Sequence, residues 1–171
     1  INSAPTSMQW VSVVLAANGQ FVYAANDEVA SSGGLYMSSD YGQAFDLLSV
    51  TESNSWYSVT CDSTGQYLVA SVSGGSIYTS NNFGSTFTAT SLVASASPLV
   101  VSTSNGDYVF AAVQGGNIYS TSSCGNYVQP TQTPTEVPPP NYCSFNETYL
   151  STSLLWNSLS TSTDTGQYVY A

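Results

Sequence analysis

The chain has 171 residues, enough for a substantial hydrophobic core, and 42% of them are hydrophobic, which is more than a disordered segment contains. It has ten Asp and Glu residues but no Lys, Arg or His, so its formal net charge is −10. Proteins bind phosphates and anionic lipids through Lys and Arg. The composition therefore argues against nucleic-acid binding and binding to anionic membranes, and no apolar run is long enough for membrane insertion.

Short strands in a repeating order are predicted along the chain. In the first 50 residues, β-branched and apolar residues predict four strands, the first of them buried: residues 10–17, 21–25, 35–38 and a strand that begins at 45. A Gly-Gly pair followed closely by an apolar residue and Tyr recurs at Tyr36, Tyr78 and Tyr119, which are 42 and 41 residues apart. Four strands in about 40–45 residues are typical of β-propeller blades.

A turn motif lies between the predicted third and fourth strands of each unit. Its shared residues are a hydroxyl, Asp or Asn, Gly and an aromatic: Ser38, Asp40, Gly42 and Phe45 in the first copy, Ser80, Asn82, Gly84 and Phe87 in the second, and only Gly125 in the third. The Asp or Asn side chain can accept hydrogen bonds from nearby backbone N–H groups, and Gly tolerates a positive φ. We expect the aromatic residue to anchor the turn in a core.

This octapeptide resembles the Asp-box, or BNR repeat, of sialidase- and sortilin-type β-propellers, with Ala44 where Thr is usual and Asn82 in place of Asp. The resemblance implies that the turn is structural and joins the third and fourth strands of a blade. It concerns the fold rather than the function, because the motif occurs in sialidases, receptors, glucanases and assembly factors. The sequence thus predicts an all-β fold of tandem four-stranded antiparallel blades of a partial or fragmentary β-propeller, with a Pro-rich linker.

The repeats predict three parts of the chain. Residues 1–128 hold three Asp-box blades, at about 8–50, 55–94 and 97–128; residues 129–142 are a Pro/Thr-rich linker, and 143–171 start a further repeat. Trp10 and Gly19 recur as Trp156 and Gly166, 146 and 147 residues later, which is consistent with a longer tandem array. Propellers typically need four to eight blades to close. Three and a half blades must therefore belong to a larger protein, combine with other copies, or stack openly.

Three cysteines and several polar residues are candidates for covalent modification. We predict a disulfide between Cys124 and Cys143, which flank the linker, and a buried free thiol at Cys61. Asn146 begins the sequence Asn-Glu-Thr and is a candidate N-glycosylation site. The linker offers candidate O-glycosylation sites on Thr or modified Pro: Thr131, Thr133, Thr135, Pro138, Pro139 and Pro140.

The acidic residues do not predict an active site. Sialidases hold the substrate carboxylate with arginines, which this chain lacks, and without His no Ser-His pair can form. Asp27 and Glu28 are an adjacent pair in a loop that is either solvated or a cation or catalytic site. Four other acids lie at or beside repeat turns, where we expect structural roles: Asp40, Asp62, Asp107 and Asp164. We therefore predict no catalytic residue, no metal site and no cofactor.

Together these features predict a non-catalytic extracellular or cell-surface glycoprotein that has a structural or assembly role in a surface filament, appendage or wall. Its expected partners are other copies of the repeat, by self-association, and covalent glycans. The alternative is a carbohydrate-binding or glycan-degrading propeller whose active residues lie outside these 171 residues.

Overall fold

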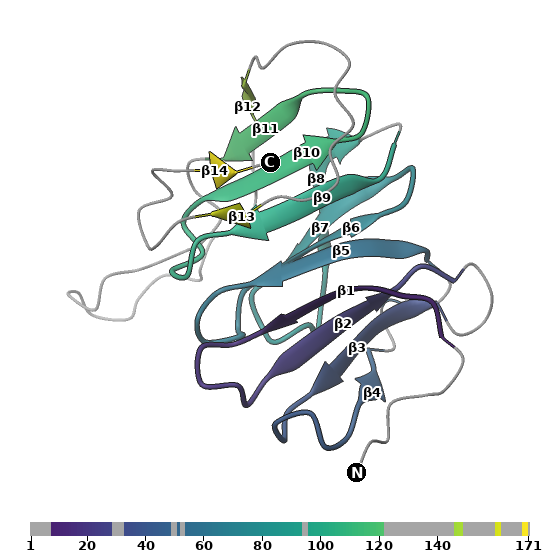
Figure 1. Cartoon of the computed structure of the whole chain (residues 1–171), viewed down its shortest axis with the longest axis vertical. Coiled ribbons are helices and arrows are strands. Elements are labelled where there is room, and N and C mark those ends of the chain that lie inside the picture. The colour runs from purple at the N-terminus through teal and green to yellow at the C-terminus, as the bar shows by residue number, and fades with distance from the viewer. Residues whose placement is uncertain are drawn as a thin grey trace, which may run out of the picture.

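The computed structural model describes residues 8–28, 33–48, 51, 54–93, 96–121, 146–148, 160–161 and 169–170. Figure 1 shows their strands arranged as sheets that follow one another along the molecule. The predicted all-β fold of tandem four-stranded antiparallel blades of a β-propeller is confirmed. The third copy of the turn, with Gly125, and the linker lie outside the described residues.

The first blade contains the four strands expected from the sequence. They are ordered β1-β2-β3-β4 in the sheet, and their bounds are β1 Trp10–Leu15, β2 Val22–Asn26, β3 Gly34–Ser38 and β4 Asp46–Leu47. The second blade repeats this order with β5 Trp56–Cys61, β6 Leu68–Val72, β7 Ser76–Ser80 and β8 Thr88–Val93. Neighbouring strands pair antiparallel in both blades, so each blade is a simple meander.

The third sheet takes its last strand from an unexpected part of the chain. Its strands are β9 Pro98–Ser102, β10 Val109–Val113, β11 Ile118–Thr121 and β12 Asn146–Thr148. The segment 143–171, expected to start a further repeat, thus supplies β12, which pairs with β11. A Pro-rich sequence follows β11, and Pro cannot donate a ladder hydrogen bond, so a strand from beyond the linker fills this position. A further antiparallel pair follows, β13 Ser160–Thr161 and β14 Val169–Tyr170.

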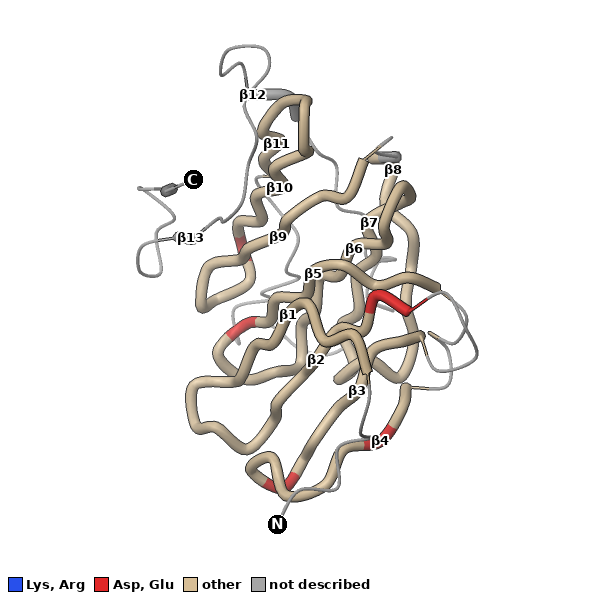
Figure 2. The backbone as a smooth tube through the Cα atoms, turned by 45° about the vertical axis from the view of Figure 1, so that its right-hand side comes forward, with Lys and Arg blue, Asp and Glu red and all other residues tan. Residues whose placement is uncertain are grey.

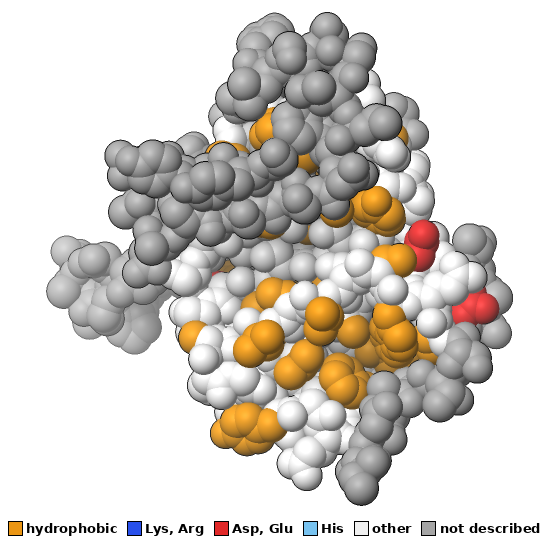
Figure 3. All heavy atoms as spheres, viewed as in Figure 1, with side chains coloured by type: hydrophobic (Ala, Val, Ile, Leu, Met, Phe, Trp, Pro, Cys, Tyr) orange, Lys and Arg blue, Asp and Glu red, His pale blue; other side chains and the backbone are white. Residues whose placement is uncertain are grey.

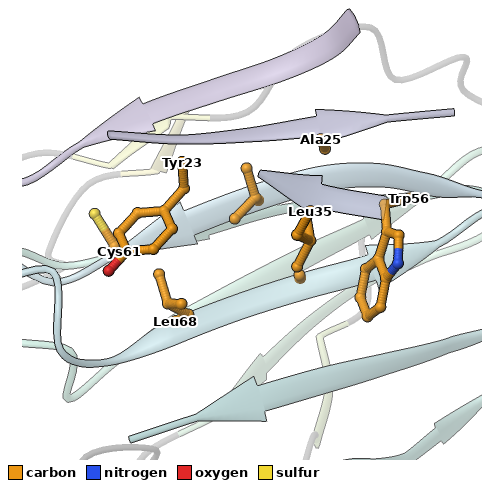
Figure 4. Close-up of a cluster of buried hydrophobic side chains, with 8 residues drawn as sticks. Tyr23, Ala25, Leu35, Trp56, Cys61 and Leu68 are labelled. Atoms are coloured by element: carbon orange, nitrogen blue, oxygen red, sulfur yellow. The ribbon is translucent and has the colours of Figure 1, made fainter. Parts of the chain in front are cut away.

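The blades pack face to face through apolar side chains. Figure 4 shows Tyr23 and Leu35 of the first blade beside Leu68 and Trp56 of the second. Between the second and third blades, Val69 and Ile77 pack against another buried cluster: Val100, Val109 and Ala111. Because successive side chains of a strand point to opposite faces, each blade offers one apolar face to the blade before it and another to the blade after it.

Hydroxyl groups link the first strands of successive blades, which lie side by side as β1, β5 and β9. The Ser12 hydroxyl accepts a hydrogen bond from the Val59 amide at 3.2 Å, and the Ser58 hydroxyl accepts one from the Val100 amide at 3.1 Å. We call these two contacts the hydroxyl clasps. The Val59 and Val100 amides lie on edge strands, which have a neighbouring strand on one side only. The serine hydroxyls supply these two amides with an acceptor.

The packing predicts different costs for two matched tryptophans. Trp56→Ala should lower the free energy of unfolding by about 3–5 kcal/mol, because the buried ring packs between blades and its Nε1 donates to the Thr51 carbonyl at 2.8 Å. Trp10→Ala, at the same position of the first blade, should lower it by less than half as much. Urea titration of dilute protein, followed by circular dichroism, measures both values. Equal losses would contradict the packing described.

Candidate functional site

The most unusual surface feature is an exposed apolar face on the first blade. Figure 3 shows hydrophobic side chains gathered over the region of β1 and β2. We call this surface the Trp10 face. Its exposed residues are Trp10, Val13 and Leu15, and it also includes the buried Ala24 and Tyr36 and the half-buried Phe45. It is hollowed: a cavity of about 390 Å³ lies against β1, Ala24 and Phe45. A contiguous exposed apolar patch on a protein surface marks an interaction site.

Strand pairing identifies the counterpart of each residue of this face in the second blade. β1 pairs with β2 from Trp10↔Asn26 to Leu15↔Val22, and β5 pairs with β6 from Trp56↔Val72 to Cys61↔Leu68. Both pairings are irregular at the same step, just after the Trp. Trp56, Val59 and Cys61 are therefore the counterparts of Trp10, Val13 and Leu15.

The residues of the Trp10 face and their counterparts in the second blade differ in exposure to solvent. Trp56, Val59 and Cys61 are 2%, 4% and 8% exposed, because the first blade covers them. Their counterparts Trp10, Val13 and Leu15 are 38%, 69% and 59% exposed. The expectation that residues 10–17 form a buried strand is thus wrong for these side chains. The strand forms, but its outward side chains lack the cover that their counterparts receive from a preceding blade.

The aromatic geometry of the two faces is also alike. Trp10 lies edge-on to Tyr36 with ring centroids 5.1 Å apart, and Trp56 lies edge-on to Tyr78 at 5.3 Å. Phe87 of the second turn is 5.8 Å from Trp56, and Phe45 of the first turn lines the hollow that Trp10 also lines. The Trp10 face therefore has the architecture of a blade-to-blade contact surface.

Two turns of matching geometry connect β3 to β4 in the first blade and β7 to β8 in the second. The Ser38 hydroxyl donates to Asp40 Oδ1 at 2.7 Å and accepts from the Gly42 amide at 2.9 Å, while the same Oδ1 accepts from the amides of Gln43 and Ala44, both at 2.9 Å. These bonds, that from Ala44 above all, lower the pKa of Asp40.

The second turn repeats the pattern with an amide in place of the carboxylate. Ser80 donates to Asn82 Oδ1 at 3.0 Å, and that oxygen accepts from the Thr86 amide at 2.9 Å. Gly42 and Gly84 have φ of 80° and 79°, the left-handed region that Gly occupies most easily. In both turns one Oδ1 atom accepts from the serine hydroxyl and from the backbone, with two backbone amides at Asp40 and one at Asn82.

Three other described acids accept hydrogen bonds: Asp107 accepts from the Asn105 side-chain amide at 2.7 Å, and the other two are Asp62 and Asp27. Asp62 accepts from the Tyr67 amide at 3.0 Å and from the Thr64 hydroxyl at 2.6 Å, and Asp27 accepts from the Ser55 hydroxyl. Figure 2 shows the acids spread over separate parts of the chain. Among the residues that the structure describes, no three potential metal ligands gather. Asp164 lies outside these residues.

Cys61 is a free, buried thiol, as the sequence predicts. Burial, together with the smaller effect of the neighbouring Asp62 charge, raises the pKa of this thiol to about 12. Asn146 lies in β12, of which the backbone alone is described. The other predicted modification sites lie outside the described residues: Cys124, Cys143, Thr131, Thr133, Thr135, Pro138, Pro139 and Pro140. In the described part of the chain, no helix is long and apolar enough to cross a membrane.

The architecture defines a β-propeller-type repeat fold, and solved structures share it. YCF48 bound to D1 peptide is 13% identical with a TM-score of 0.61, over 92% of this chain and 46% of that one. An auxiliary nutrient binding protein from Bacteroides ovatus is 11% identical with a TM-score of 0.63, over 93% of this chain and 36% of that one.

An ancestral GH74 enzyme is 16% identical with a TM-score of 0.51, over 67% of this chain and 17% of that one. At such identities the likeness shows the fold alone. The chain spans less than half the length of these three structures. No protein-family model and no curated protein matches it.

The lowered pKa of Asp40 predicts a pH-dependent contribution to stability. A carboxyl group whose pKa is lower in the folded state stabilises the fold above its unfolded pKa, and this contribution is lost as the pH falls through the folded pKa. Asp40→Asn should therefore be less stable than the natural protein near neutral pH and equally stable in strong acid. Asn82→Asp is the reverse control and should gain the same dependence. Urea midpoints measured from neutral pH to strong acid give the stability of each variant relative to the natural protein. A difference that does not change with pH would contradict the stabilising role of the Asp40 carboxylate.

Proposed function

We propose that this chain is a non-catalytic extracellular structural glycoprotein whose Asp-box blades assemble into a filament, surface appendage or wall. The observation that supports this most strongly is the Trp10 face, because its counterpart in the second blade is a buried blade-to-blade contact. A surface built in this way is suited to receive another blade rather than a soluble substrate.

The turns support the Asp-box part of the proposal. Asp40 accepts from two backbone amides of its turn and Asn82 from one. The Ser38 and Ser80 hydroxyls donate to the same two Oδ1 atoms. Carboxylates committed to such bonds hold the blades in shape, whereas glycoside hydrolysis needs two carboxylates on either side of the scissile bond. This use of the acids favours a scaffold over an enzyme.

The covalent features complete the proposal. A disulfide between Cys124 and Cys143 would close the linker into a loop, with a stabilisation on the order of 3 kcal/mol in the loop-entropy model. Glycans on Asn146 and on the linker Thr or Pro residues would shield a surface of uncharged polar groups. Both features require an oxidising, extracellular location.

Carbohydrate binding is the second candidate, and one observation favours it. The hollow of the Trp10 face has a volume of about 390 Å³, within the range of small-molecule sites. Trp10 and Phe45 line it, and aromatic rings can stack on sugars. Against this, the matching Trp56 is buried among residues of both blades.

Electron microscopy of the native, unfractionated protein tests the assembly function. We expect negative staining to show regular fibres or sheets, because an uncovered apolar face drives association. Compact separate particles that bind a soluble glycan would contradict the assembly role and favour the second candidate. Intact mass measured before and after deglycosylation serves as the check on covalent glycans.

A further inference from the structure

We propose that a single water molecule binds between the second and third blades and pairs the buried hydroxyl of Thr79. The site is a small cavity lined by residues of both blades, among them Asp62, Val69, Thr79 and Gly106. These four residues are buried, so the site belongs to the interior of the described blades. The inference goes beyond the proposed function and does not depend on assembly.

The Thr79 hydroxyl is the group that calls for a ligand. Thr79 is 3% exposed, and no described residue forms a hydrogen bond with its Oγ1 atom. Thr79 follows Ile77 by two residues on β7, so both side chains point to the same face of the sheet, the face that packs against the third blade. A buried hydroxyl without a partner destabilises a fold, and a bound water would remove this cost.

The size and the lining of the cavity suit one water molecule. About 10 Å³ is open to the centre of a water molecule, which is near the minimum that a bound water needs. Polar residues contribute to the lining from both blades: Asp62, Thr79 and Ser80 from the second and Ser102 from the third. A buried water requires two to four polar partners, and this lining offers that number.

The junction between the first and second blades shows how protein atoms fill the corresponding place. Tyr23 pairs with Met37 in the first blade, as Val69 pairs with Thr79 in the second, and Tyr23 and Val69 are each the second residue of their strand. A large aromatic and a long thioether side chain at the first junction are thus replaced by two small β-branched side chains at the second. Fewer side-chain atoms at the same place leave the cavity.

The Tyr23 hydroxyl also shows which polar contact the second junction lacks. It donates to the Gly65 carbonyl of the next blade at 2.7 Å. Gly106 corresponds to Gly65, because each lies in the turn before the second strand of its blade, with φ of 75° and 78°. Val69 has no hydroxyl that could reach Gly106. A water beside Thr79 would supply the polar group that the phenol supplies at the first junction.

Asp62 provides an acceptor for this water. It is buried, and its carboxylate accepts from the Tyr67 amide at 3.0 Å and from the Thr64 hydroxyl at 2.6 Å. The two oxygens of a carboxylate have about four acceptor sites, so Asp62 has capacity for a further hydrogen bond. The first blade has Ala16 at the corresponding place, where its amide closes the same kind of turn. The second junction is therefore polar where the first is apolar.

The test counts bound water molecules. Magnetic relaxation dispersion of water ¹⁷O, measured on dilute protein, detects waters that stay bound for longer than the protein takes to tumble. We expect Val69→Tyr to hold one such water fewer than the natural chain, because the phenol would fill the cavity as Tyr23 fills the first junction. The matched control Thr79→Ser keeps the hydroxyl and should keep the count. Equal counts for the natural chain and Val69→Tyr would overturn the site.

Thr79→Val gives a second measurement, which does not require a larger side chain to fit. Valine has nearly the shape of threonine, so the fold should be retained, and circular dichroism checks this. Removing a hydroxyl that water pairs should lower the folding equilibrium constant about fivefold in urea titration. Thr60→Val sets the scale, since the Thr60 hydroxyl lies 3.0 Å from that of Ser102. Removing an unpaired hydroxyl from a dry cavity would instead stabilise the fold, so an unchanged or higher equilibrium constant would overturn the site.

The salt in the titration distinguishes water from a small cation held by the Asp62 carboxylate. The natural chain and Thr79→Val are compared in sodium chloride and in tetramethylammonium chloride, whose cation is too large for the cavity. A water site predicts the same loss in both salts. A loss that occurs only in sodium chloride would overturn water as the ligand.

Discussion

The absence of cationic side chains constrains how this molecule can hold together. With no Lys, Arg or His, no ion pair between side chains can form, and the ten acids can only repel one another or accept hydrogen bonds. Cohesion between blades must then come from apolar faces and from hydroxyl groups. The structure uses both: Trp56 and Tyr23 fill one junction, Ile77 and Val100 fill the next, and serines join the first strands.

The same constraint explains the importance of single oxygen atoms at the turns. Asp40 Oδ1 accepts from two backbone amides and Asn82 Oδ1 from one, at the points where the chain reverses. Backbone amides replace the cations that would balance an acid in most proteins. At Asp40 these hydrogen bonds lower the pKa, so they stabilise the carboxylate in the folded chain.

Much of the fold could be predicted because it depends on local pattern. The spacing of Tyr36, Tyr78 and Tyr119 and the turn residues predicted strands and blades from residues near one another in the sequence. The source of β12 could not be predicted, since its pairing with β11 crosses the linker. The clasps could not either, because Ser12 and Ser58 are two among many serines, and only the closeness of β1, β5 and β9 selects them.

The candidate site was missed for a related reason. Residues 10–17 have the composition of a buried strand, and the sequence alone gives no sign that their cover is missing from the first blade. Trp10 and Val13 occupy the strand positions of Trp56 and Val59 and differ from them in exposure, which only the folded chain reveals. A repeat protein thus identifies its own contact surfaces, because each buried junction is a template for an exposed one.

Charge distribution bears on whether copies of such a chain can meet. Two molecules of net charge −10 repel at long range, and salt screens this repulsion beyond about 8–10 Å. Asp40 and Asp62 lie in turns, and the residues that line the hollow of the Trp10 face are uncharged. Asp62 is buried and Asp40 is half-buried, so solvent reaches the two carboxylates unequally.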